Sequence, residues 1–219
     1  MILPHIALES GKNPRHSIIW LHGLGADGND FVPMVDELKL PSAVRFIFPH
    51  APKIPVTING GFVMRAWYDI AGDSIDEQQD EAGIHRSQAA IEAFIAQEIA
   101  RGIPAEHIFL AGFSQGGAIA LHTALHLQTP LAGVLALSTY LPLADLANAE
   151  TINRSAPIFM AHGRNDPVVP YALGVASRDR LLHLNCSVDW HMYPMQHSVC
   201  NEEVMDIQAW LTKMMLVKG

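Results

Sequence analysis

The chain has 219 residues, of which 49% are hydrophobic and 16% are charged. This length and composition predict a single domain over residues 1–219 with one well-packed core, and they exclude a disordered or collagen-like chain. The formal net charge is −8, with 14 lysine and arginine residues and no basic run. No nucleic acid is therefore expected as a partner.

Targeting signals and a disulfide framework are also not expected. The N-terminal segment lacks a basic stretch followed by a long apolar one, and no apolar run approaches the length of a membrane span. Cys186 and Cys200 are the two cysteines, in what read as a strand start and a loop. We expect a cytoplasmic enzyme or binding protein with reduced thiols and no transmembrane segment.

Strand and helix patterns alternate along the chain. Apolar residues recur at helical spacing over residues 84–99 and 204–214. Short β-branched or apolar runs predict buried strands over residues 17–21, 44–48, 108–113, 132–138, 157–162 and 188–193. This alternation predicts an α/β fold with a mostly parallel central sheet and helices on both faces.

The glycines of "GLGADG", residues 23–28, match the spacing of a dinucleotide-binding loop. That interpretation requires a helix that begins within the glycines and an acidic residue at the end of the next strand. Here Asp30 and Pro33 predict a later helix start, and the next strand ends in Phe48-Pro49-His50 without a carboxylate. The loop is therefore not expected to bind NAD.

Residues 49–69 interrupt the alternation, with three prolines, two adjacent glycines and no sustained period. A connection of this length usually has a function or is disordered, and its apolar residues argue against disorder. Two interpretations stay open: the segment covers an edge of the core, or it forms the wall of an apolar substrate pocket. Exposed aromatic and Met residues there would suit a fatty substrate or a partner such as a second copy in a homodimer.

The motif "GFSQGG", residues 112–117, lies between a predicted strand and a helix that begins near Gln115. A nucleophile elbow needs this setting, because it holds a serine on a strained turn while flanking glycines let strand and helix approach closely. Ser114 is the expected nucleophile; the alternative is a serine that only caps the helix. Ser138, also at a strand end, lacks the glycines.

A serine nucleophile needs a histidine base and an acid that orients it. Asp166 and His197 each follow a later predicted strand, so both should lie at the sheet edge that carries Ser114. The alternative for Asp166 is an ordinary turn residue before a proline. Among other histidines, His191 should point into a packed face as part of a strand.

Two further histidines, His122 and His126, have the i and i+4 spacing of metal ligands. No third ligand is evident, so we expect a solvated helix face and no metal.

An acyl-transfer site also needs backbone N–H groups directed at the developing oxyanion. The loop after an early strand and the residue after the nucleophile supply them in this arrangement. We assign these donors to Leu24 and Gln115. The glycines around Leu24 would let this backbone approach the substrate closely.

Several motifs in order resemble the carboxylesterase and acyl-protein thioesterase family of small α/β-hydrolases, once described as lysophospholipases. The motifs are "HGLGADGNDF", "RFIFPHAP", "MRAWYDI", "IFLAGFSQGGAIAL", "LALSTYLP", "HGRNDPVVP" and "QHS", the last followed by two glutamates. The resemblance runs from about residue 15 to the C-terminus. It implies an α/β-hydrolase fold without a large lid domain.

The resemblance also implies roles for single residues. Ser114, Asp166 and His197 match the family's triad, and Leu24 and Gln115 match its oxyanion hole. Trp67 and Asp69 match a W-x-D segment beside the acyl channel, and we expect the acyl pocket to involve Met64, Trp67, Leu141 and Val168. One departure is Gln196, where many members place glycine before the catalytic histidine, which leaves the shape of that loop open.

The sequence therefore predicts a serine hydrolase of carboxylic esters or thioesters that uses no metal or organic cofactor. The family implies short to medium acyl chains, on a small or lipid-like molecule or on an acylated protein. Two alternatives stay open. One is a binding protein that kept the fold without catalysis, and the other is a hydrolase of lactones or peptides with the same triad.

Overall fold

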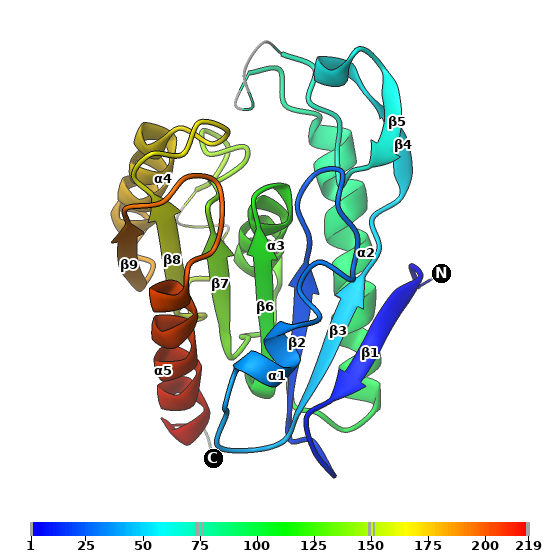
Figure 1. The fold of residues 1–219 in the computed structure, drawn as a ribbon, viewed down its shortest axis with the longest axis vertical. Coiled ribbons are helices and arrows are strands. Elements are labelled where there is room, and N and C mark those ends of the chain that lie inside the picture. Colours follow the sequence, from blue (N-terminus) through cyan, green and yellow to red (C-terminus); the bar gives the residue numbers. More distant parts are fainter. Residues whose placement is uncertain (1, 73–74, 76, 149, 151, 218–219) are drawn as a thin grey trace.

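The computed structural model describes residues 2–72, 75, 77–148, 150 and 152–217. A seven-stranded sheet forms the centre, in the order β1-β3-β2-β6-β7-β8-β9 (Figure 1). β1 runs antiparallel to β3, and each other neighbouring pair is parallel. The strands are β1 (His5–Glu9), β2 (His16–Leu21), β3 (Val44–Pro49), β6 (Ile108–Phe113), β7 (Gly133–Leu137), β8 (Ile158–Gly163) and β9 (Val188–Tyr193). The mostly parallel sheet expected from the sequence is confirmed.

Helices cover both faces of this sheet, as expected (Figure 1). One face packs against α2 (Glu81–Ala100), α3 (Gln115–His126) and α4 (Tyr171–His183), and the other against α1 (Met34–Glu37) and α5 (Asn201–Val217). The period of two along each strand divides the apolar residues between these two cores. In β2, for example, Ile19 belongs to the first core and Ile18 to the second.

Two strand features were missed at the sequence level. β1 is an edge strand whose residues are only partly buried, so it lacks the continuous apolar run of the central strands. Residues 49–69 contain a hairpin of β4 (Lys53–Val56) and β5 (Phe62–Arg65), joined through the 3₁₀ turn η1 (Thr57–Asn59). Pro55 hides the alternation because proline is unusual inside a strand, and the glycine pair at 60–61 lies in the turn between two strands of only four residues each.

The helix pair α2 and α3 buries a histidine that was expected on a solvated face. His122 is 2% exposed, and its ring lies between those of His85 and His126, at centroid distances of 5.4 and 4.2 Å. Burial, with the two neighbouring rings, lowers the pKa of His122 to about 3. The expectation was wrong for His122 because α2 packs on this face of α3.

Other findings concern the thiols, metal ligands and the membrane. Both cysteines, Cys186 and Cys200, are free. Over the described residues, no group of three potential ligands is arranged to hold a metal ion. None of the helices in this part of the chain has the length and apolar character needed to cross a bilayer.

Glu203 is a buried carboxyl on α5 whose ionisation should weaken the fold. Burial raises its pKa from 4.5 to about 8, with the Asp206 carboxylate adding to the effect. Because the folded-state pKa is the higher one, stability is lost as pH rises between these two values. Between pH 6 and 9 this carboxyl should lower the free energy of unfolding by on the order of 2 kcal/mol, seen as the difference between the pH dependence of the wild type and that of Glu203→Gln.

Denaturant unfolding at both pH values measures this difference. The matched control is Glu202→Gln, because Glu202 is the exposed neighbour on the same turn. A Glu203→Gln protein that loses as much stability as the wild type would contradict the prediction.

Candidate active site

Ser114 lies at the sharp junction between β6 and α3. Its backbone has φ 53° and ψ −122°, outside the regions that a side chain normally allows. Two hydrogen bonds hold the turn: Ser114 N–H donates to Leu137 O (2.9 Å), and Thr139 Oγ1 donates to Ser114 O (2.7 Å). The end of β7 therefore supports the strained residue.

Glycines make the junction sterically feasible. A Cβ on Gly112 would lie 2.3 Å from Gly116 O, and one on Gly116 would lie 2.4 Å from Leu21 O. Any side chain there would push α3 away from β6 and β2. Close approach, rather than left-handed backbone, is thus the reason for these two glycines, and the strain falls on Ser114 instead.

Asp166 and His197 meet in the structure. His197 Nδ1 donates to Asp166 Oδ2 at 2.7 Å, and the second carboxylate oxygen accepts the N–H groups of Val168 (2.8 Å) and Val169 (2.9 Å). The Asp166 side chain is fully buried and the His197 side chain is 16% exposed. The carboxylate is therefore fixed on one side and orients the imidazole on the other.

The loop of His197 reaches the elbow from the neighbouring strand end. The His197 ring lies 4.7 Å from that of Phe113, the residue before Ser114. Ser138 Oγ donates to Ser198 O at 3.5 Å and joins the same loop to the end of β7. In the described chain no hydrogen bond joins the Ser114 hydroxyl to His197, so their pairing belongs to the proposal below.

Gln196, the departure from the family pattern, fits its position without strain. It is not among the non-glycine residues with positive φ, so the loop does not require glycine there. The close approach falls on Gly163 instead, where a Cβ would lie 2.3 Å from Gln196 O. Asn165 N–H, which donates to Met195 O at 3.0 Å, fastens the two loops together.

The alternative histidine, His191, has other partners. Its ring nitrogens lie 3.2 Å from Asp189 and 3.4 Å from Asp206, and its ring stacks on Phe159 at 4.5 Å. It therefore pairs with carboxylates of β9 and α5 and not with Asp166.

The two expected oxyanion donors occupy suitable backbone positions. Gln115 is the first residue of α3, where N–H groups have no acceptor within the helix and the helix dipole favours negative charge. Leu24 N–H has no acceptor among the described residues, while the next residue, Gly25, donates to Arg65 O at 2.9 Å. Leu24 and Gln115 line the same cavity as Ser114.

The Gln115 side chain ties this region to the segment after β5. Its Oε1 accepts Trp67 N–H at 2.7 Å, and its Nε2 donates to Tyr68 O at 2.8 Å. Trp67 Nε1 in turn donates to His22 O at 2.8 Å. The Gln115 side chain thus connects the start of α3, through Trp67, to the loop that carries Leu24.

His22 completes the connection. Its Nδ1 donates to Gly23 O (2.7 Å) and its Nε2 accepts Ala51 N–H (3.1 Å), which defines a neutral ring. Burial lowers the pKa of His22, in keeping with this state. His22 was not singled out from the sequence, although it begins the quoted motif "HGLGADGNDF".

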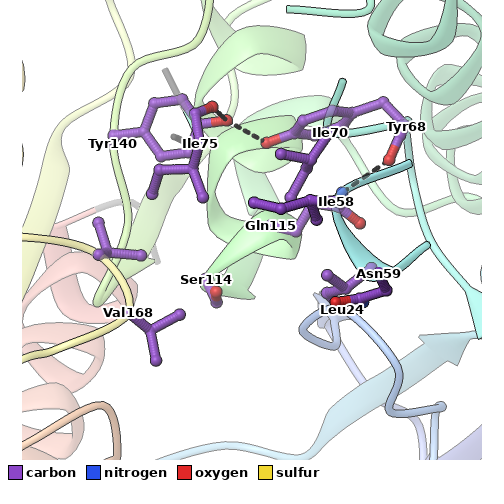
Figure 2. A pocket seen from close by; sticks show the side chains of 11 residues that line it. Leu24, Ile58, Asn59, Tyr68, Ile70, Ile75, Ser114, Gln115, Tyr140 and Val168 are labelled. Atoms are coloured by element: carbon purple, nitrogen blue, oxygen red, sulfur yellow. Dashed lines mark hydrogen bonds between the residues drawn. The ribbon is translucent and has the colours of Figure 1, made fainter. Parts of the chain in front are cut away.

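A mainly apolar cavity of about 230 Å³ opens beside Ser114. Figure 2 shows Ser114 between Val168 on one side and Leu24 and Asn59 on the other, with Tyr68 and Tyr140 across the cavity. The hydroxyls of these tyrosines are hydrogen-bonded at 2.7 Å, a pair that sequence reasoning missed. The lining residues are Leu24, Ile58, Asn59, Tyr68, Ile70, Ile75, Ser114, Gln115, Tyr140, Val168 and Val169.

Of the four residues expected around the acyl pocket, only Val168 lines this cavity. Trp67 is 2% exposed, because its indole N–H is bonded to the His22 carbonyl within the core. Met64 lies on β5, where its sulfur accepts Asn59 Nδ2 at 3.3 Å, and Leu141 lines a separate cavity against α4. The expectation of an exposed Trp67 was therefore wrong. The assignment of Met64, Trp67 and Leu141 to the acyl pocket stays a prediction.

The fold and site define an α/β hydrolase, and the comparisons with known proteins identify the family. Residues 4–215 match the family model described as Phospholipase/Carboxylesterase. The chain belongs to this family. It is a serine hydrolase that cleaves esters or thioesters, as the sequence predicted.

Three similar proteins cover nearly the whole chain. Acyl-protein thioesterase 1 of Neurospora crassa is 43% identical over 91% of this chain and 87% of its own. The crystal structure of Zea mays acyl-protein thioesterase 2 has a TM-score of 0.86 and 29% identity, over 97% of this chain and 99% of that one. Arabidopsis thaliana SOBER1 has a TM-score of 0.85 and 31% identity, over 92% and 99% respectively.

The Gln115 amide gives a testable prediction for the site. Gln115→Ala keeps the backbone N–H but leaves Trp67 N–H and Tyr68 O without a partner, at a cost of about 1–3 kcal/mol for each buried group. We expect a lower melting temperature and a fall in kcat/KM of roughly tenfold or more for a p-nitrophenyl ester. Gln97→Ala, an exposed glutamine on α2, is the control. Unchanged kcat/KM for Gln115→Ala would show that the amide does not position the donors.

Proposed function

We propose that the chain is an acyl hydrolase in which Ser114 is the nucleophile, His197 the base and Asp166 the orienting acid. The observation that carries this proposal is the fixed Asp166–His197 pair at the same sheet edge as a strained serine. The similarity to acyl-protein thioesterases supports it further.

The reaction then has two steps. His197 Nε2 takes the proton of Ser114 as its oxygen attacks the carbonyl carbon, and the N–H groups of Leu24 and Gln115 receive the oxyanion. The imidazolium returns the proton to the leaving alcohol or thiol, and an acyl-enzyme remains. Water then attacks with the same base and releases the acid. The Ser114–His197 hydrogen bond needed for this transfer commonly tightens when substrate binds.

The cavity supports an acyl chain as the group that is bound. Its described lining residues carry no charge, and most are aliphatic or aromatic. An apolar chain gains from leaving water for such a wall, whereas a charged peptide side chain would lose its hydration without a partner. We therefore propose short to medium acyl chains, carried by a small or lipid-like molecule or by an acylated protein.

We also propose that residues 1–219 form a single domain and that the enzyme acts in the cytoplasm. One sheet that connects β1 with the strands before α5 supports the first proposal. The two free cysteines support the second, because thiols persist in reducing compartments.

Ser114→Ala tests the nucleophile. It should leave the fold intact and lower turnover of a p-nitrophenyl ester by a factor on the order of 10⁴ or more. Steady-state kinetics and circular dichroism measure the two quantities. Ser155→Ala, at an exposed serine away from the sheet edge, should behave as the wild type. A folded Ser114→Ala protein with wild-type turnover would refute the assignment.

A second prediction concerns acyl-chain length. Ile58 lines the cavity from the β4–β5 hairpin and is 42% exposed, so Ile58→Phe should fold and narrow the space. We expect kcat/KM to fall roughly tenfold or more for octanoyl substrates and to stay near wild type for acetyl substrates. Steady-state kinetics on a matched chain-length series of oxyesters and thioesters measures this change and also compares kcat/KM between the two ester classes.

The control for this series is Val63→Phe. Val63 is 58% exposed on the same hairpin and does not line the cavity. If both variants alter chain-length preference equally, the cavity beside Ser114 does not hold the acyl chain.

A further inference from the structure

His162 is a second histidine beside the Asp166 carboxylate. It lies in β8 and is fully buried. Its Nε2 is 2.9 Å from Val169 O and 3.6 Å from Asp166 Oδ2, the oxygen that also accepts His197. We propose that His162 is a positioning residue that holds Asp166 in the geometry and charge state required by His197. This inference rests on the proposed function of the triad.

The protonation of His162 follows from its partners. A carbonyl only accepts hydrogen bonds, so Nε2 carries the proton and donates it to Val169 O. Burial lowers the pKa of His162, which keeps the ring neutral. The other ring nitrogen, Nδ1, is buried without a hydrogen-bond donor among the described residues. One N–H group therefore donates to the Val169 carbonyl and lies 3.6 Å from the Asp166 carboxylate.

Val169 transmits the position of His162 to Asp166. Its N–H donates to Asp166 Oδ1 at 2.9 Å, and its C=O accepts from His162 at 2.9 Å. Val169 is thus hydrogen-bonded through its N–H to Asp166 and through its C=O to His162. If His162 releases the carbonyl, the turn that presents two N–H groups to Asp166 loses its support from β8.

The ring of His162 is fixed in place by α4 and β9. A Cβ on Gly174 of α4 would lie 2.5 Å from Nδ1, so the ring occupies the space that a side chain would need. Trp190 of β9 lies nearly parallel to it at 6.3 Å, and Tyr171 of α4 meets it edge-on at 6.1 Å. Because Nδ1 is enclosed and has no donor, Nε2 is the ring nitrogen that contacts Val169 and Asp166.

The electrostatic consequence has a definite sign. The N–H group at Nε2 carries partial positive charge, lies 3.6 Å from Asp166 Oδ2 and favours the ionised carboxylate. The charged or titratable groups that face His162 are Asp166 and His197, with Tyr171 from α4 and no acid or base from Trp190 of β9. Removal of the N–H should therefore let the pair bind a proton at higher pH.

The experiment compares variants with and without a hydrogen-bond donor at the position of His162 Nε2. His162→Phe keeps an aromatic ring and removes the N–H, and His162→Met is a second apolar variant with an adaptable shape. His162→Gln can place an amide N–H near the position of Nε2. His191→Gln is the control, because this histidine of the next strand contacts Asp189 and Asp206 instead.

Three quantities are measured: melting temperature, the pH profile of kcat/KM, and the midpoint of the His197 ring titration by NMR. For the apolar variants we expect kcat to fall about tenfold or more, and the acid limb and the NMR midpoint to move upward by about half a pH unit or more. His162→Gln should restore kcat to within about threefold of wild type and reverse most of the shift.

The outcomes separate this inference from the proposed function. A wild-type protein without ester or thioester hydrolysis would refute the proposed function, while the NMR midpoint would still report whether His162 acts on His197. Folded apolar variants with unchanged kcat and midpoint would overturn the role of His162. Equal losses in the glutamine and apolar variants would also overturn it, since packing alone would then account for the effect.

Discussion

The strained backbone of Ser114 is the constraint on which the rest of the site depends. A residue with φ 53° can persist between β6 and α3 only because the surrounding structure holds it there. Gly112 and Gly116 let strand and helix approach closely enough, and the bond from Ser114 N–H to Leu137 O fixes the turn to β7. The same junction presents the hydroxyl at the sheet edge and leaves the Gln115 N–H at the first position of α3, without an acceptor inside the helix.

Each remaining part of the site is tied to this junction by side chains that do not themselves react. Gln115 binds the backbone after β5, and His22 and Trp67 connect that segment to the loop of Leu24. On the other side, Asp166 is held by two N–H groups of its own turn and orients His197. The proposed chemistry therefore depends on buried polar contacts between sheet ends, which hold the Gln115 side chain and the Asp166–His197 pair in place.

The sequence predicted the central strands, the helices on both faces and the family, because continuous apolar runs and the G-x-S-x-G turn are local signals. It also predicted the meeting of Asp166 and His197, since their strands end at one edge. It failed where long-range packing decides: the buried face of His122, the core position of Trp67, and the hairpin around Pro55. Tyr68 and Tyr140 gave no local signal, because each has its partner on a distant part of the chain, whereas His162 begins the quoted motif "HGRNDPVVP" and was not singled out.

Covalent labelling of the serine tests the central claim most directly. A fluorophosphonate reacts only with a serine hydroxyl that has been activated as a nucleophile, and mass spectrometry of the digested protein locates the adduct. The account predicts one adduct per chain, on Ser114, with none on Ser138, which directly follows β7. An unlabelled Ser114 in folded protein, or an adduct on another serine, would contradict it.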